Sequence, residues 1–365
     1  MNLSNTLIIW YKKFARELPW KSDRDPYKIW VSEIILQQTR VEQAKDYYLR
    51  FISHFPSVES LANAPLDHLL RLWQGLGYYS RARNMHVAAK QIVAEYHGDF
   101  PRSVQALSLL KGVGPYTAAA IASFAFDYPV VAIDGNAFRI FSRLFAESCP
   151  IDSSGAHNLF SGLAQQCMMD TPSSLFNQAI MDFGSLVCKP QPLCMECPMN
   201  VQCIAFAQNR VQEFPVKRFK KKPRDRFFYY LHITSKDSGK ECTYIQQRHQ
   251  RDIWQNLYQF PLIETEAPVS VGELPNLPQW HTIFEEETPL VLGYAPKYLH
   301  RLTHQVIHTF FVRIEMEKES EWLHTHCKEI DASSLDRYGV SRLMERYLLD
   351  EEIKYLPLWH ANSLE

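Results

Sequence analysis

The chain has 365 residues, of which 46% are hydrophobic and 13% aromatic, enough apolar side chain for two ordered domains with separate cores. No stretch approaches the roughly 20 consecutive apolar residues needed to span a bilayer, and the first 20 residues resemble an amphipathic helix more than a secretory signal. The composition argues against a disordered or membrane-spanning protein, and we expect an intracellular one.

The net charge of -1 conceals two halves of opposite sign. Residues 1–226 carry 26 Lys and Arg against 19 Asp and Glu, a net charge of +7, whereas residues 227–365 carry 13 against 21, a net charge of -8. The halves meet in Phe214–Arg226 (FPVKRFKKKPRDR), a proline-containing segment with seven basic residues. We interpret residues 208–226 as a basic interdomain linker, which either is simply solvated or lies on a phosphate backbone.

The predicted elements change type at this linker. Before it, apolar residues recur at spacings of three and four, as in Ile29, Trp30 and Ile34, which predicts a mostly α-helical domain. After it, segments such as RFFYYLHIT and QVIHTFFVRIE alternate and are rich in aromatic and β-branched residues, which is typical of strands.

A glycine-rich corner lies within the helical part, in LKGVGPYTA (Leu110–Ala118). Gly112 and Gly114 allow positive φ and close approach, and Pro115 fixes the start of the next helix. Successive backbone N–H groups at such a helix start form an anion site, and in a basic domain the natural anion is a DNA phosphate.

Four of the eight cysteines form one short motif with the spacing C-x5-C-x2-C-x5-C: Cys188, Cys194, Cys197 and Cys203. Disulfides are not expected without a secretory route, so these thiolates are predicted to bind metal. Structural zinc usually joins two distant C-x2-C pairs, whereas one compact loop suits a [4Fe-4S] cluster. The cluster is the prediction and zinc is the alternative.

Several motifs together resemble the MutY-type adenine DNA glycosylases of the endonuclease III (helix-hairpin-helix) superfamily. The resemblance covers essentially the whole chain and departs from the usual pattern in the first cysteine gap, which has five residues where the family usually has six. The motifs are LPW (Leu18–Trp20), DPYKIWVSEIILQQTRV (Asp25–Val41), WQGLGYYSRARN (Trp73–Asn84), GVGPYTA (Gly112–Ala118), DGNAFR (Asp134–Arg139) and NQAIMDFGSLVC (Asn177–Cys188).

The resemblance implies a two-domain fold and a DNA substrate. The expected organisation is an all-α helix-hairpin-helix glycosylase domain over residues 1–207 with a [4Fe-4S] loop, the linker, an α+β MutT-like (Nudix-fold) domain over 227–348, and a tail over 349–365. The expected partner is double-stranded DNA containing 8-oxoguanine:A or G:A mismatches, bound by a monomer. The expected reaction is hydrolysis of the N-glycosidic bond of a flipped-out adenine.

The resemblance also gives roles to residues that, taken alone, would be assigned to the surface of a helix or to a turn. It makes Glu33 the general acid that protonates the adenine, with a pKa raised by its apolar neighbours. It makes Asp134 the group that stabilises the oxocarbenium ion and captures C1′, while its position also suits a helix N-cap. Tyr116 stands where bifunctional relatives carry a Schiff-base lysine, so we expect its hydroxyl, and Asn136, to bond Asp134 or the developing charge.

DNA contacts follow from the same resemblance. Gln38 and Tyr78 are expected to enter the base stack, Thr39 to contact the 8-oxoguanine strand, and Leu36 and Leu76 to act as apolar wedges. In the second domain the hydrolytic Nudix box is absent, so we expect recognition there instead of hydrolysis. Its segment LTH aligns with the family's FSH, which makes Thr303 and His304 candidate contacts to 8-oxoguanine.

Two other functions stay open from the sequence. One is an endonuclease III-like glycosylase for oxidised pyrimidines, which Tyr116 and the second domain disfavour. The other is a non-catalytic iron–sulfur DNA-binding protein, which would need neither Glu33 nor Asp134.

Overall fold

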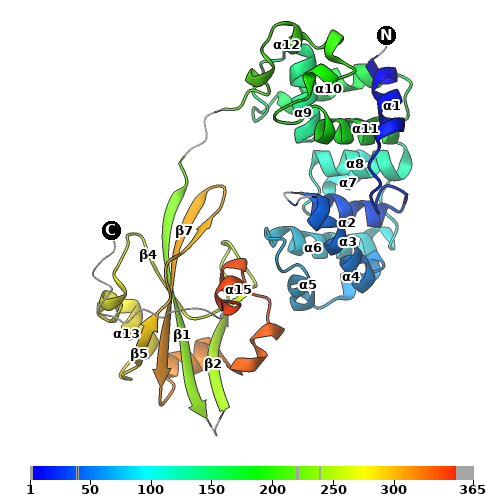
Figure 1. The fold of residues 1–365 in the computed structure, drawn as a ribbon. Helices are drawn as coiled ribbons and strands as arrows, with labels where there is room; N and C mark the ends of the chain where they lie inside the picture. Colours follow the sequence, from blue (N-terminus) through cyan, green and yellow to red (C-terminus); the bar gives the residue numbers. More distant parts are fainter. Residues whose placement is uncertain (1–2, 38, 40, 219–221, 238–239, 351–365) are drawn as a thin grey trace. The chain divides into compact units, whose positions relative to one another are not determined.

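The computed structural model describes residues 3–37, 39, 41–218, 222–237 and 240–350 (Figure 1). The chain forms two compact units, one of Met1–Asn63 with Asn84–Lys220 and one of Ala64–Arg83 with Lys221–Glu365. The sequence did not indicate that Ala64–Arg83 would group with the later residues. Within the described ranges, every helix is too short or too polar to cross a membrane.

The first unit is helical, as its apolar spacing predicts. Helix α6 starts in the other unit and enters this one at Asn84. The helices are α1 (Leu3–Phe14), α2 (Pro26–Leu36), α3 (Val41–His54), α4 (Val58–Asn63), α6 (Ser80–Tyr96), α7 (Val104–Leu109), α8 (Pro115–Phe126), α9 (Gly135–Phe145), α10 (Ala156–Met168), α11 (Ser173–Leu186) and α12 (Ile204–Ala207).

Helix α2 is almost entirely enclosed. Asp25 caps its N-terminus by accepting a hydrogen bond from the Tyr27 backbone N–H, and Pro26 occupies the first turn. Eight of its eleven residues are buried, and the helix packs against both α3 and α8. Glu33, one of the buried positions, is therefore removed from water although its side chain is polar.

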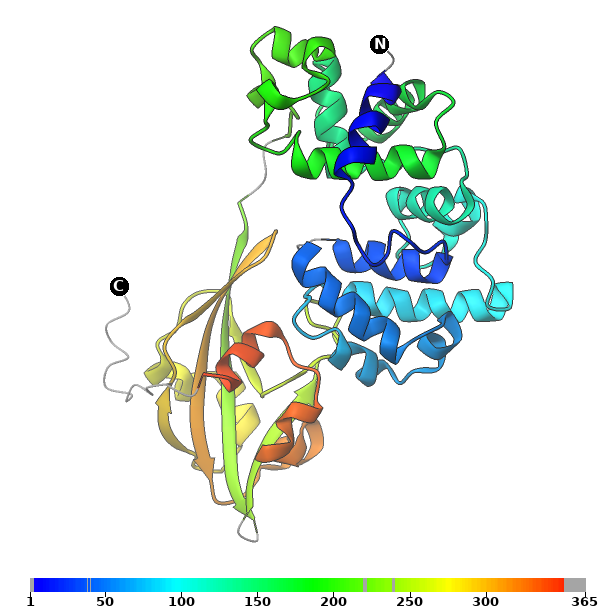
Figure 2. The ribbon, with the colours of Figure 1, turned by 45° about the vertical axis from the view of Figure 1, so that its right-hand side comes forward.

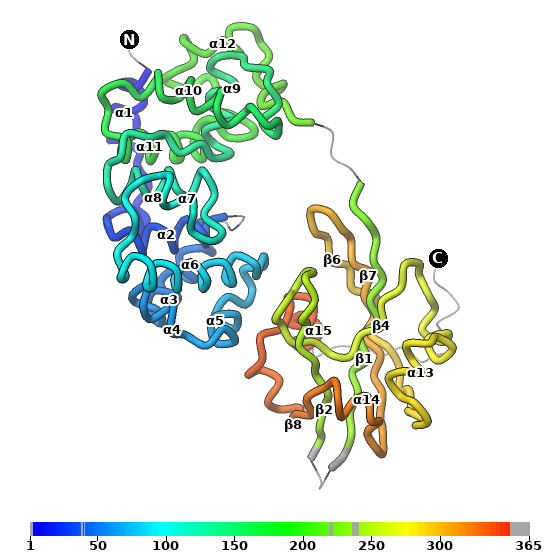
Figure 3. Tube along the Cα trace, turned by 180° about the vertical axis from the view of Figure 1, so that it is seen from behind, coloured from blue at the N-terminus to red at the C-terminus, as the bar shows by residue number. Residues whose placement is uncertain are grey.

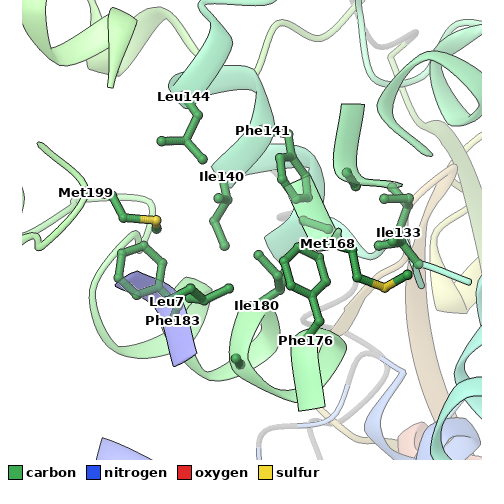
Figure 4. Close-up of a cluster of buried hydrophobic side chains, with 14 of the residues drawn as sticks. Leu7, Ile133, Ile140, Phe141, Leu144, Met168, Phe176, Ile180, Phe183 and Met199 are labelled. Atoms are coloured by element: carbon green, nitrogen blue, oxygen red, sulfur yellow. The ribbon is translucent and has the colours of Figure 1, made fainter. Parts of the chain in front are cut away.

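One hydrophobic core joins the first helix of this unit to its last segments (Figure 4). Because side chains from α1, α9, α10, α11 and the cysteine loop interlock there, the loop is held against the helix that begins beside Asp134. The labelled members are Leu7, Ile133, Ile140, Phe141, Leu144, Met168, Phe176, Ile180, Phe183 and Met199.

The second unit contains a mixed sheet with helices. Its strands are β1 (Arg224–Asp237), β2 (Lys240–Gln247), β3 (Tyr258–Gln259), β4 (Leu262–Thr265), β5 (Leu290–Tyr294), β6 (Tyr298–Arg301), β7 (Gln305–Met316) and β8 (Lys328–Asp331). Its helices are α5 (Leu66–Leu72), α13 (Pro278–Phe284), α14 (Glu321–His326) and α15 (Arg342–Leu348).

The sheet order is β3-β2-β1-β7-β5, with β4 on β1, β6 on β7 and β8 on β2. Strands β1 and β7 pair in parallel from Arg224 opposite Gln305 to Ser235 opposite Met316, and the other pairs are antiparallel. Strand β1 therefore begins inside the predicted linker, because Arg224–Arg226 already pair with β7.

Both faces of this sheet are covered, as Figures 2 and 3 allow the reader to follow. Alternate residues of β1 point to opposite sides, so Tyr229 joins a core with α13 and α14, whereas Tyr230 joins a second core with α15. Leu302 in the β6–β7 hairpin packs against this second core. Because both faces are covered, the consecutive residues Phe228–Leu231 of β1 and Phe310–Val312 of β7 are all apolar.

Candidate active site

A cavity of about 560 Å³ opens in the first unit where α2, α8, α9 and α11 meet. All four residues predicted for catalysis lie on its wall. The lining includes Glu33, Leu36, Thr39, Tyr116, Asp134, Asn136, Gln178 and Asp182.

Glu33 is buried on α2, with 5% of its surface exposed. The pKa of this carboxyl is raised to about 7: burial raises it most, the hydrogen bond from Tyr116 lowers it, and the charge of Asp134 raises it. The raised pKa expected from the apolar neighbours of Glu33 is therefore present. Near neutral pH, the carboxyl is divided between its protonated and ionised forms.

Tyr116 contacts a different carboxyl from the expected one. Its hydroxyl donates to Oε2 of Glu33 at 2.5 Å, and no hydrogen bond joins it to Asp134 within the described part of the chain. The reason is that Tyr116 stands in the first turn of α8, which packs on α2, and the Asp134 oxygens already have donors. Burial raises the pKa of the Tyr116 phenol well above its ordinary value, so the hydroxyl keeps its proton.

Asp134 caps α9, as its position at the start of DGN suggested. Its Oδ1 accepts the Ala137 backbone N–H at 2.7 Å, and its Oδ2 accepts the Asn136 side-chain amide at 2.7 Å. The predicted contact between Asn136 and Asp134 therefore exists. Burial raises the pKa of Asp134, and these hydrogen bonds oppose that increase.

Asn136 is itself held by two groups that the sequence did not indicate. Arg139 donates to Oδ1 of Asn136 at 2.7 Å and to the Gly184 carbonyl at 2.8 Å. A Cβ at Gly184 would lie only 2.5 Å from Cβ of Asn136, so glycine is required by close approach. Asn136, Arg139 and Gly184 lie in the motifs DGNAFR and DFGSL, but the motifs alone do not indicate that these residues touch one another.

The sequence also did not indicate a second group of polar residues on the cavity wall, which surrounds Asp182. Asp182 has no exposed side-chain surface and bonds Arg16 and Lys21, both of which line the cavity. Nearby, Gln178 of α11 accepts a hydrogen bond from the hydroxyl of Tyr11 on α1. Tyr11 and Gln178 are far apart in the sequence, and the packing of α1 on α11 brings them together.

Only some of the residues of the first unit that are predicted to contact DNA line the cavity. Leu36 and Thr39 line it, whereas Gln38 lies outside the described residues. Gly112 has φ of 77°, and a Cβ there would lie 2.6 Å from Cβ of Asn84. Gly114 differs from the expectation: its φ is -82° as the N-cap of α8, and a Cβ there would meet open space.

The remaining DNA-contact candidates belong to the second unit. Leu76 is 8% exposed, so its side chain is inside the protein and does not suit the predicted wedge role. Tyr78 is 43% exposed with a positive φ of 47°. Thr303 and His304 are exposed in the β6–β7 hairpin, and within this unit the hydroxyls of Thr303 and Tyr78 lie 3.3 Å apart.

The four motif cysteines face one common space. Cys188, Cys194, Cys197 and Cys203 all line a small cavity against α9 and α11, so their arrangement fits a shared group. Among the described residues, no group of three or more Cys, His, Asp or Glu is close enough together to hold a metal ion as it stands. The buried guanidinium of Arg143 donates to the Cys188 sulfur at 3.5 Å, which suits a site that carries thiolate charge.

The buried glutamate, the glycine corner and the aspartate-capped helix all lie in a stretch that matches a class of DNA-repair proteins. Residues 31–154 match the HhH-GPD superfamily of base excision DNA repair proteins, and residues 229–350 match the NUDIX domain family. The predicted fold class, an all-α domain followed by an α+β domain, is thereby confirmed.

Two relatives narrow the class. The adenine DNA glycosylase of Buchnera aphidicola (subspecies Baizongia pistaciae) is 36% identical over 258 residues, covering 70% of this chain and 72% of the relative. The mouse adenine DNA glycosylase is 43% identical over 219 residues, and the match covers 57% of this chain but only 42% of the mouse protein. The chain belongs to the adenine DNA glycosylase family.

A solved structure supports the helical fold. A thermostable thymine-DNA glycosylase aligns with a TM-score of 0.53 and 28% identity, covering 56% of this chain and 95% of that protein. The family and the fold together make the chain a DNA N-glycosylase, an enzyme of base excision repair.

Proposed function

We propose that this chain removes adenine mispaired with 8-oxoguanine or guanine in double-stranded DNA. The observation that carries the proposal is the meeting of Glu33, Tyr116 and Asp134 on one cavity wall, in a chain of this family. A cavity of about 560 Å³ is large enough for a flipped-out nucleobase. The enzyme acts as a monomer and associates with DNA.

Glu33 supplies the proton that lets the base leave. Its pKa of about 7 keeps a useful fraction protonated at neutral pH, which is the condition for a general acid. The Tyr116 hydroxyl donates to Oε2, so the transferable proton belongs on Oε1. Protonation of adenine, in this family at N7, makes it depart as a neutral base.

Asp134 stabilises the positive charge that develops on the sugar. The Ala137 N–H and the Asn136 amide hold the carboxylate in place, so little reorganisation is needed as the oxocarbenium ion forms. We propose that Asp134 then captures C1′ covalently and that water releases the sugar, as in a retaining glycosidase. Asn136 positions Asp134 through its amide.

The reaction stops at base removal because Tyr116 offers no amine for a Schiff base. Replacing Tyr116 with Lys should create some strand cleavage, detected by trapping with borohydride. If no adduct is trapped, then the lysine amine at this position does not reach C1′.

DNA recognition is assigned to residues around the cavity and in the second unit. Leu36, Gln38, Thr39 and Tyr78 would contact the opened stack and the opposite strand. The corner at Gly112 and Gly114 would contact a phosphate. The exposed pair Thr303 and His304 would recognise 8-oxoguanine.

The cysteine loop would hold a [4Fe-4S] cluster through Cys188, Cys194, Cys197 and Cys203. Burial raises the pKa of the Cys197 thiol to about 11, so the bound iron would stabilise the thiolate form. The cluster, when bound, supplies a cross-link and an electron-transfer centre. Its place beside the core of α9 and α11 would fix the helix that Asp134 caps.

The test is excision from three duplexes that contain 8-oxoguanine:A, G:A or thymine glycol, followed by alkali to reveal abasic sites. Adenine loss from the first two duplexes, and none from the third, is expected. Cleavage at thymine glycol would favour an enzyme for oxidised pyrimidines, and binding without any excision would favour a non-catalytic protein.

A further inference from the structure

We propose that Tyr11 is a positioning residue that fixes the side-chain amide of Gln178 and so makes the cavity select adenine over 6-oxopurines. The Tyr11 hydroxyl, on α1, donates to Oε1 of Gln178, on α11, at 2.8 Å. Gln178 lines the cavity that contains Glu33 and Asp134. The inference rests on the proposed function and adds the means by which the base is selected.

The direction of this hydrogen bond is set by the groups around Tyr11. Tyr11 is only 7% exposed, so its hydroxyl proton needs a protein acceptor. The other acceptor in the cluster, the Asp182 carboxylate, already receives hydrogen bonds from Lys21 Nζ and from the backbone N and Nε of Arg16. The Tyr11 proton is therefore directed to Gln178.

Two further features keep Tyr11 in this role. Burial and the charge of Asp182 raise the pKa of Tyr11 to about 12, so the hydroxyl remains a donor at any physiological pH. The ammonium of Lys21 lies 5.2 Å from the centre of the Tyr11 ring, close enough for a cation–π contact that helps hold the ring.

The consequence for Gln178 is a fixed amide orientation. Its Oε1 faces Tyr11, and its Nε2 has no hydrogen-bond partner among the described residues, which leaves this donor to a ligand. A flip of the amide would place Nε2 against the Tyr11 hydroxyl and take away the acceptor of the phenolic proton, while the Asp182 carboxylate is already occupied by Arg16 and Lys21. Tyr11 thus decides which amide atom is free.

Adenine suits this arrangement and 6-oxopurines do not. Adenine presents an acceptor, N1, beside a donor, the N6 amino group, so an amide can pair with both through its free N–H and the second lone pair of its oxygen. Hypoxanthine presents N1–H and O6, the reverse pattern, which would require the flipped amide. A fixed Gln178 therefore discriminates between two bases of nearly equal size.

The experiment compares single-turnover excision of adenine and hypoxanthine opposite 8-oxoguanine in the full chain. Tyr11→Phe should lower the adenine-to-hypoxanthine rate ratio by about tenfold, the scale of one lost hydrogen bond, because the amide can then rotate. In a Gln178→Ala background the same Tyr11→Phe change should leave the ratio unaltered. This double-mutant comparison separates positioning from a general loss of packing.

Tyr27→Phe is the matched control, since it also removes a buried tyrosine hydroxyl, one that donates to the Phe55 carbonyl at 2.6 Å away from the cavity lining. It should leave the ratio unchanged. An unaltered ratio in Tyr11→Phe, or an altered ratio that persists without Gln178, would overturn the inference. Wild-type protein that excises no adenine would instead refute the proposed function.

Discussion

Replacing Glu33 with Gln should stop excision and, at neutral and alkaline pH, increase the stability of the protein. Gln has nearly the same shape and can still accept the Tyr116 hydrogen bond, but it has no acidic proton to give. Binding to mismatched DNA should stay within about an order of magnitude of wild type, because the lost proton is needed only in the transition state.

The magnitude of the stability change follows from the pKa of Glu33. The folded pKa of about 7 lies above the ordinary value of 4.5 that applies to the unfolded chain, so the folded state binds more protons between these values. Wild type therefore loses stability as the pH rises from 4.5 through 7. The full cost of ionising the buried carboxyl is roughly 3 kcal/mol, and the Gln variant does not incur it.

The assay is denaturant unfolding of wild type and Glu33→Gln at several pH values from 5 to 8.5. The difference in unfolding free energy should be small at the acid end and grow to roughly 3 kcal/mol above pH 7. Glu17→Gln, at an exposed position, serves as the control and should show little pH-dependent difference. A Glu33→Gln difference that does not change with pH would refute the raised pKa, and substantial residual excision would refute the role as proton donor.

Three further results are expected. Tyr116→Phe removes a hydrogen bond that lowers the pKa of Glu33, so the fall in excision rate with rising pH should shift upward by about one pH unit; an unmoved midpoint in the pH–rate profile would contradict this. Purified protein should be brown, absorb broadly near about 400 nm and contain iron matched to one [4Fe-4S] cluster per chain, whereas stoichiometric zinc in protein made with iron available would overturn the cluster. Thr303→Ala with His304→Ala should weaken binding to 8-oxoguanine:A by about 1 to 3 kcal/mol and affect G:A much less. Gel-shift affinities on both duplexes test the last result, and an equal loss on both would assign this hairpin to backbone contact or to the fold.

Local sequence was enough for features that depend on neighbouring residues. The spacing of Ile29, Trp30 and Ile34 predicts α2, and the position of Asp134 at the start of DGN predicts its cap on α9. The strand-rich character after the linker and the single cysteine loop were equally visible. These features follow from side-chain periodicity, backbone φ restrictions and short-range hydrogen bonds, all of which act within a few residues.

Contacts between distant segments had to come from the tertiary structure. The Tyr116 hydroxyl reaches Glu33, 83 positions away, instead of Asp134, because packing of α8 on α2 sets the distance. Tyr11 contacts Gln178, 167 positions away, because α1 packs on α11, and no pattern in either helix predicts this contact. The sequence by itself determined which chemical groups the protein carries and on which elements. Only the packing of helices decided which groups touch and how far burial shifts a pKa, because both depend on atoms contributed by other parts of the chain.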